Sequence, residues 1–181
     1  LSFCPSKERF KMSVILVVDD EPLQRDILKT ILDSAGYETY TASSGKEALI
    51  IAKKTHPEVI LTDLKMEGMD GIELLEAIPK EPFEPEPSIV IITAHGTISS
   101  AVEAVKKGAF DYLTKPLDKD SLLLTVRRGA ERATLLKENL HLQKELFDRF
   151  RIEAIIGKSV KMQKAIEIMK KVAPSAATVI I

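Results

Sequence analysis

The stretch Val14-Ile15-Leu16-Val17-Val18-Asp19-Asp20-Glu21 joins an unbroken apolar run to three consecutive acids. An apolar run rich in β-branched residues is typical of a strand that is buried on both faces. Pro22 follows at once and opens a segment with helical spacing of apolar residues, which runs to Ala35 and ends at Gly36. This order of buried strand, polar turn and helix predicts a unit of a parallel α/β sheet.

The same alternation continues on the C-terminal side of this unit. Further strands are expected at 37–41, 59–62, 89–92 and 110–113, and further helices at 44–54, 71–78 and 98–107. Strands that alternate with helices in this way predict a parallel sheet with helices on both faces. Prolines at positions 79, 82, 85 and 87 interrupt the rhythm, so we expect segment 79–87 to be extended and non-helical.

A long helix is expected after Pro116, because residues 118–150 contain no proline and many strong helix formers. Mostly apolar residues at a spacing of three or four form two adjacent stripes: Val126, Gly129, Ala133, Leu136, Leu140, Gln143, Phe147 and Phe150, and beside them Leu135, Asn139, Leu142 and Leu146. A surface this wide exceeds what one small domain can bury. We therefore expect residues 119–150 to be a linker helix that pairs with its copy in a homodimer. A helix folded back on its own domain is the alternative, and which stripe forms the seam stays open.

The two ends of the chain lack cores of their own. Residues 1–11 show no periodicity and no apolar signal region, and we expect them to be a leader or a poorly ordered extension. Segment 160–172 is amphipathic and segment 178–181 reads as a strand. Because thirty-one residues from 151 to 181 cannot bury a core, we expect them to open a domain that continues beyond Ile181.

Composition excludes several classes of protein. The 26 Lys and Arg residues balance 27 Asp and Glu residues, which argues against a broad polyanion-binding surface. No uncharged apolar run approaches the roughly 20 residues needed to span a bilayer, so we expect no membrane association. A single cysteine, Cys4, permits neither an intrachain disulfide nor a cysteine zinc cluster, and a reducing, cytoplasmic setting fits best.

Polar side chains follow the ends of four expected strands. They are Asp19 and Asp20, then Asp63 and Lys65, then Thr93, then Lys115. Ligands of open parallel sheets bind outside the carboxyl ends of the strands, so these groups are expected to meet at one edge. Carboxylates about 4 Å apart repel by roughly 4 kcal/mol at an effective dielectric constant near 20. Such a cluster needs a cation, and Mg²⁺ suits a site of few carboxylates that shares phosphate oxygens.

A metal, an amine and a hydroxyl around one carboxylate predict a site for a phosphoryl group, with the carboxylate as nucleophile. Each member also has a local interpretation. The acids before Pro22 could cap a helix, Asp63 could belong to a turn, and Lys115 could be a solvated loop residue. Their coincidence at one sheet edge favours the shared site.

Five motifs carry a resemblance to the receiver domain of two-component response regulators, which we place at residues 12–118. Beside Val17–Glu21 they are Leu61-Thr62-Asp63-Leu64-Lys65-Met66, Met69-Asp70-Gly71, Ile92-Thr93-Ala94 and Gly108-Ala109-Phe110-Asp111-Tyr112-Leu113-Thr114-Lys115-Pro116. The resemblance implies a flavodoxin-like (CheY-like) fold of five parallel strands. It also implies that Asp63 accepts a phosphoryl group from a sensor histidine kinase.

The same resemblance assigns the remaining site residues. It implies that Mg²⁺ is held by Asp19, Asp20, Asp63 and the backbone carbonyl of Lys65. Thr93 and Lys115 would contact the phosphoryl oxygens, Thr93 and Tyr112 would be a switch pair, and the Lys115–Pro116 bond would be cis.

Residues 151–181 carry a narrower likeness. Ile155-Ile156-Gly157-Lys158-Ser159, Lys171-Val172-Ala173-Pro174-Ser175 and the strand at 178–181 resemble the entry to the AAA+ domain of NtrC/DctD-type, sigma-54-dependent transcriptional activators. For the parent protein this implies ATPase activity and contacts with sigma-54 RNA polymerase and DNA. No G-x-x-x-x-G-K-[ST] loop occurs in this sequence, so we expect neither an ATP site nor enzymatic activity in it.

Two rival functions remain. A Mg²⁺-dependent aspartate-nucleophile phosphatase would need a second acid two residues after Asp63, where Lys65 stands. A receiver-like scaffold that is never phosphorylated would not need the complete set of acids, hydroxyl and lysine.

Overall fold

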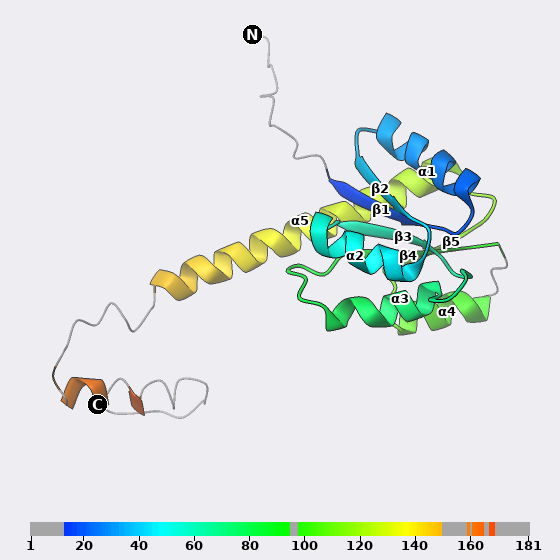
Figure 1. Ribbon diagram of the computed structural model, residues 1–181. Helices are drawn as coiled ribbons and strands as arrows, with labels where there is room; N and C mark the ends of the chain where they lie inside the picture. Colours follow the sequence, from blue (N-terminus) through cyan, green and yellow to red (C-terminus); the bar gives the residue numbers. More distant parts are fainter. Residues whose placement is uncertain (1–12, 95–97, 150–158, 160, 165–166, 169–181) are drawn as a thin grey trace, which may run out of the picture. The chain divides into compact units, whose positions relative to one another are not determined.

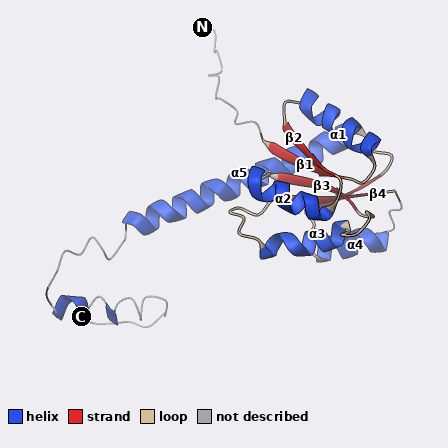
Figure 2. Cartoon of the chain, in the orientation of Figure 1, coloured by secondary structure: helices blue, strands red, loops and turns tan. Residues whose placement is uncertain are grey.

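Parallel strands alternate with helices through most of the chain (Figures 1 and 2). The computed structural model describes residues 13–94, 98–149, 159, 161–164 and 167–168. The elements are β1 Val14–Val18, α1 Pro22–Ser34, β2 Glu38–Ala42, α2 Gly45–Thr55, β3 Val59–Asp63, α3 Gly71–Ala77, the 3₁₀ turn η1 Ile78–Lys80, β4 Ser88–Thr93, α4 Ile98–Lys106, β5 Asp111–Thr114 and α5 Lys119–Arg149. The expected order of elements is confirmed.

The strands form one parallel sheet in the order β2-β1-β3-β4-β5. Strands β3 and β4 are buried along their whole length, which is why their sequences are continuous apolar runs rather than alternating ones. The chain passes from β1 to β2 on one side and reaches β3 on the other side of β1. The strand order therefore reverses at β1 and β3, and the carboxyl ends of these two strands mark the expected ligand site of the sheet.

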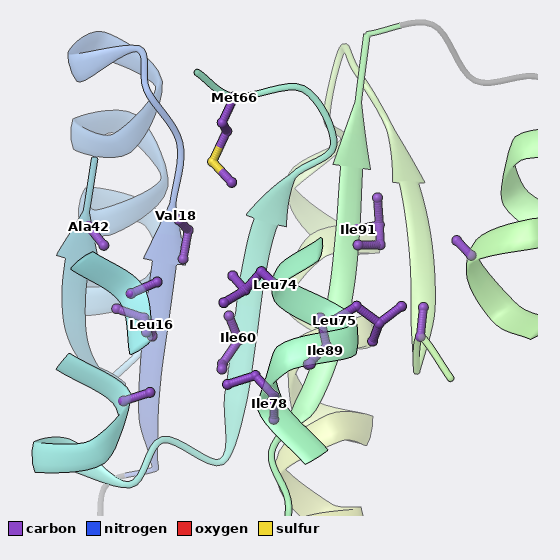
Figure 3. Close-up of a cluster of buried hydrophobic side chains, with 14 of the residues drawn as sticks. Leu16, Val18, Ala42, Ile60, Met66, Leu74, Leu75, Ile78, Ile89 and Ile91 are labelled. Carbon is purple, nitrogen blue, oxygen red and sulfur yellow. The ribbon is translucent and has the colours of Figure 1, made fainter. Parts of the chain in front are cut away.

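Two apolar clusters cover the two faces of the sheet. On one face, Leu28 and Leu32 of α1 and Leu122 and Val126 of α5 pack against alternate residues of β1, β3 and β4. On the other face, α2, α3 and α4 pack against the intervening residues. Figure 3 shows the second cluster, in which Leu74, Leu75 and Ile78 lie over Ile60 and the neighbouring strands. The predicted three-layer α/β fold is confirmed.

Side chains at the helix starts fix two of the boundaries. Asp70 caps α3, since its Oδ1 accepts a hydrogen bond from the Glu73 amide at 2.7 Å, and the Glu73 carboxylate accepts one from the Asp70 amide at 3.0 Å. Ser44 caps α2, since its hydroxyl oxygen accepts a hydrogen bond from the Glu47 amide. Gly36, at φ +89°, follows α1 in a backbone conformation that other residues rarely adopt.

One local expectation needs correction. Segment 79–87 was expected to be non-helical, but Pro79 lies within the 3₁₀ turn Ile78–Lys80 because proline fits the first residues of a helical turn. In α1, apolar residues that share the helical spacing differ in burial. Leu28 and Leu32 are buried, whereas Leu23 and Ile27 are exposed. Helical spacing identifies the helix but does not set the width of the face that the sheet covers.

The expected long helix is confirmed as α5, and its two parts differ in burial. Leu122, Val126, Ala130 and Ala133 are buried against the sheet, whereas the apolar side chains from Leu135 to Leu146 are exposed. The chain divides into two compact units between residues 138 and 139, so the first unit extends beyond residue 118 and includes the first part of α5.

The ends of the chain are only partly described. Residues 161–164 and 167–168 are helical and fall within the amphipathic segment 160–172. The expectations for residues 1–11 and for the strand at 178–181 lie outside the described residues. Among the helices that the structure describes, none combines the length and the apolar character needed to cross a bilayer.

Candidate functional site

The structure brings three of the expected site residues together at the carboxyl edge of the sheet. Asp19 directly follows β1, Asp63 ends β3, and Lys115 directly follows β5. The Lys115 Nζ atom lies 2.7 Å from Asp63 Oδ1 and 3.0 Å from Asp19 Oδ2. The two carboxylates come from neighbouring strands, and one ammonium bridges them.

Backbone geometry explains how Lys115 reaches this position. Its amide donates a hydrogen bond to the carbonyl of Thr93 at 2.7 Å, which continues the pairing of β4 and β5 by one residue. The Lys115–Pro116 peptide bond is cis, as the resemblance implies.

Each of the two acids uses its second oxygen locally. Asp63 Oδ2 accepts a hydrogen bond from the Lys65 amide at 2.8 Å, and Asp19 Oδ1 accepts one from the Glu21 amide at 2.8 Å. In both cases the donor lies two residues further along the chain, which is the usual pattern for an aspartate at a turn. Asp63 thus lies in a turn, as its local interpretation predicts, and it also lies beside Lys115. The turn orients each carboxylate so that its other oxygen faces Lys115.

Burial makes the interaction of these charges strong. The side chains of Asp19, Asp63 and Lys115 are only 3%, 11% and 19% exposed, so water screens them weakly. Burial by itself would lower the pKa of the Lys115 ammonium. Hydrogen bonds and charge attraction from Asp63 and Asp19 outweigh that effect, so the pKa of Lys115 is raised above its ordinary value.

This raised pKa predicts a stability change at alkaline pH. A group whose pKa is higher in the folded state stabilises the fold fully below its unfolded pKa, here 10.5, and the contribution is lost as pH rises through the folded value. We expect wild type to lose its stability advantage over Lys115→Met across that window. Urea unfolding of both proteins, from neutral pH to above 10.5, measures it. A stability difference that stays constant with pH would contradict the role of the ammonium.

The two expected switch residues lie on one face of the sheet. Thr93 is the last residue of β4 and is 3% exposed, and Tyr112 is a partly buried residue of β5 that packs against the cluster containing Ile91 and Ala104. Tyr112 pairs in register with Ile91, two residues before Thr93, so Thr93 and Tyr112 are diagonal neighbours on the same face. A movement of Thr93 toward the acids would therefore change the space beside Tyr112.

The residues at this edge fit a divalent cation in charge and in donor type. Asp19, Asp20 and Asp63 set three formal negative charges against the one positive charge of Lys115, an excess that Mg²⁺ would balance. Within the described part of the chain, however, no three acids, histidines or cysteines already lie in a metal-binding cluster. Asp20 is exposed, while Asp19 and Asp63 are buried with Lys115. In the ligand set that the resemblance implies, the exposed Asp20 carboxylate would therefore have to join the two buried ones.

Two residues that shape the site are not predicted by the sequence analysis. Arg25 of α1 donates a hydrogen bond from Nη1 to the Asp19 carbonyl at 2.6 Å, and nothing in the sequence pattern marks it. Gly71, within the Met69-Asp70-Gly71 motif, has its Cα against the backbone of Asp63 and Leu64, so that a Cβ there would overlap the Asp63 carbonyl oxygen. A glycine directly after an N-cap residue was the signal for this close approach.

Comparison with known proteins places these residues in a family. The model of the response regulator receiver domain matches residues 15–127. Regulatory protein AtoC of Escherichia coli (strain K12) is 36% identical over 167 residues, which are 92% of this chain and 36% of that protein. The C4-dicarboxylate transport transcriptional regulatory protein DctD of Pseudomonas aeruginosa is 34% identical over 168 residues, again 92% of this chain and 36% of that protein. The chain thus spans about a third of the length of these curated relatives.

Solved structures agree with this assignment. NtrX from Brucella abortus, in a complex with ADP, superposes with a TM-score of 0.67 at 34% identity, covering 91% of this chain and 36% of that one. A response regulator receiver domain from Clostridium thermocellum superposes with a TM-score of 0.64 at 35% identity, covering 69% of this chain and 99% of that one.

Proposed function

This chain belongs to the response regulator receiver family, and from that membership we propose that Asp63 accepts a phosphoryl group from a sensor histidine kinase in the cytoplasm. In this proposal, residues 12–118 are the receiver and residues 119–150 are a linker that pairs two copies. Phosphorylation switches this dimer, which controls a sigma-54-dependent transcription activator. The chain itself is a phosphate-accepting regulator rather than an enzyme that turns over a substrate.

The observation that carries the proposal is the bridge from Lys115 to Asp63 and Asp19 at the switch point of the sheet. A buried carboxylate beside a fixed ammonium is a poor site for a neutral ligand. It suits an incoming phosphoryl group. The phosphoryl oxygens can pair with the Lys115 ammonium in place of Asp63, while one Asp63 oxygen attacks the phosphorus atom.

The chain's own residues supply position and charge for this transfer. The Lys65 amide holds the Asp63 carboxylate by one oxygen at 2.8 Å, which fixes the direction of the other. As the oxygen–phosphorus bond forms, the nitrogen–phosphorus bond of the donor histidine breaks and its electron pair returns to the imidazole. We propose that Asp19, Asp20, Asp63 and the Lys65 carbonyl hold Mg²⁺, which when bound neutralises charge on the carboxylates and phosphoryl oxygens.

A switch follows from the charge that is added. A phosphoryl group brings a charge of about −1.5 to −2 to a rim where Lys115 is already shared between two acids. Thr93, at the end of the adjacent strand, offers a hydroxyl donor to the new oxygens. We propose that Thr93 moves toward them and that Tyr112 follows, which changes the face made by α4, β5 and α5.

The exposed apolar residues of α5 support the dimer part of the proposal. Leu135, Leu142 and Leu146 are 65%, 57% and 54% exposed, which is costly for three leucines on one helix unless a partner covers them. The small-angle scattering of the chain, with and without beryllofluoride as a mimic of the phosphoryl group, tests the switch. We expect a dimer whose scattering profile changes with the mimic. An identical profile in both states would contradict the switch.

We also propose that residues 151–181 open the AAA+ domain of a longer activator. The alignments with AtoC and DctD cover 92% of the chain, so they extend beyond residue 150. ATP hydrolysis, contact with sigma-54 RNA polymerase and binding to DNA would then belong to the longer protein.

A further inference from the structure

Glu58 is a buried acid at the amino-terminal edge of the sheet, opposite the edge that carries Asp63. It directly precedes β3 and is 8% exposed. Its amide donates to the Val14 carbonyl at 2.8 Å, and its carbonyl accepts from the Ser88 amide at 2.9 Å. Its carboxylate Oε2 accepts from the Val14 amide at 2.6 Å. Glu58 thereby joins the first residues of β1, β3 and β4.

The other oxygen of this carboxylate binds α5. Lys137 Nζ lies 2.6 Å from Glu58 Oε1, in a contact between residues 79 positions apart in the sequence. The Glu58 side chain is only 9% exposed and that of Lys137 is 41% exposed. This acid is therefore largely desolvated, and the ion pair is worth more than one between two exposed groups.

The position of Lys137 on α5 gives this contact a special role. Apolar burial of α5 ends at Ala133, which is 1% exposed, and Leu135 is already 65% exposed. Beyond Ala133, the helix is attached to the sheet edge by the Lys137–Glu58 pair, one residue before the boundary between the two compact units. One turn earlier, Arg132 Nη1 donates to Ser88 Oγ at 3.2 Å, which is a weaker contact to the same edge.

The surroundings of the pair favour the attachment of Lys137 over its release. A cavity of about 50 Å³ beside it is lined by Glu58, Lys137 and Ala133, and also by His56, Phe83 and the acids Glu84 and Glu86 of the proline-rich loop. The lining thus includes three acidic residues, and Glu58 is the one whose carboxylate pairs with Lys137. Residues of the proline-rich loop and of α5 therefore line the same cavity.

We propose that Glu58 and Lys137 form a latch that holds the turn of α5 around Lys137 against the sheet, at the end of the first compact unit, and so sets where the exposed part of α5 begins. The latch lies at the sheet edge remote from Asp63, and it determines whether a change in the position of α5 is passed into the exposed part of the helix. Its regulatory meaning rests on the proposed function, but its physical behaviour does not depend on phosphorylation.

Amide hydrogen exchange in the unphosphorylated chain tests the latch. In Lys137→Met we expect exchange at residues 134–140 to rise about 5- to 10-fold, the factor for loss of a charge-assisted hydrogen bond of intermediate exposure. Exchange in β1, β3 and β4 should stay unchanged. Lys144→Met is the matched control, since Lys144 is an exposed lysine of α5 without an ion pair among the described residues. It should leave exchange at 134–140 unchanged.

Two further variants separate the latch from a general loss of helicity. In Lys137→Arg, unlike Lys137→Met, exchange at 134–140 should stay at the wild-type rate, because a guanidinium can still pair with Glu58. Glu58→Gln, which keeps an oxygen for the Val14 amide, should raise exchange at 134–140, and adding Lys137→Met to it should cause little further rise. Exchange at 134–140 that is the same in Lys137→Met and Lys144→Met would overturn the latch. If Asp63 proves not to be phosphorylated while the predicted exchange pattern is found, the proposed function fails and the latch stands.

Discussion

Asp63→Asn is expected to reduce labelling of the chain by acetyl phosphate to background, whereas the wild-type chain is labelled. The carboxamide keeps the shape of the side chain, and its oxygen can still accept the Lys65 amide hydrogen bond that holds Asp63 at 2.8 Å. It lacks the negative charge needed to attack phosphorus and to pair with Lys115 at 2.7 Å. The loss is therefore chemical and should occur without loss of the fold, which circular dichroism can check.

Asp26→Asn is the control for this experiment. Asp26 is an exposed residue of α1 whose side chain has no described hydrogen bond or ion pair with Asp19, Asp63 or Lys115, so its variant should be labelled like wild type. Chelation of Mg²⁺ should lower labelling of the wild-type chain, because the acids at the rim would keep their uncompensated charge. Labelling that persists in Asp63→Asn would move the acceptor to another residue. A wild-type chain that is never labelled would favour the unphosphorylated scaffold.

The sheet and the composition of its functional edge could be predicted from the sequence because both follow from short-range rules. Buried parallel strands leave continuous apolar runs, and the residue after each run must lie at the carboxyl edge. Asp19, Asp63 and Lys115 are therefore placed by counting residues along single strands. What could not be predicted is which oxygen pairs with which amine. The bridge by Lys115 depends on the lateral order of β1, β3 and β5 and on the direction of each turn.

Contacts between α5 and the sheet lie beyond any pattern in the sequence. Nothing in the sequence distinguishes Lys137 from the exposed lysines of the same helix, and Glu58 is a single acid in front of a strand. Only the packing of Val126 and Ala130 on the sheet sets the rotation of α5 that brings Lys137 to Glu58. The same reason explains Leu23 and Ile27, which share the helical period of Leu28 and Leu32 but extend past the area that the sheet covers. Periodicity describes one helix, whereas burial depends on its neighbour.

Gly71→Ala is expected to have the second large effect, because it alters the backbone of Asp63, the proposed acceptor. Alanine at this helical position would ordinarily be favourable by about 1 kcal/mol relative to glycine. Here the new Cβ would overlap the Asp63 carbonyl oxygen and crowd the Leu64 Cα, and neither backbone atom can move by a change of rotamer. We expect a net loss of about 1–3 kcal/mol in the free energy of unfolding, measured by urea denaturation.

The same overlap should slow phosphorylation more than the stability loss alone explains. Relief of the clash requires Asp63 to shift relative to Lys115 and the Lys65 amide, and a misplacement of about 1 Å can cost roughly 100-fold in rate. We expect labelling by acetyl phosphate to slow about 10- to 100-fold. Gly129→Ala is the matched control. Its Cβ would crowd side-chain atoms of Val59 and Ser88 at the opposite edge, so it should destabilise the fold but leave the labelling rate of the folded protein unchanged. Equal labelling rates in the two variants would mean that Gly71 serves packing alone, and that the position of Asp63 tolerates movement of its own backbone.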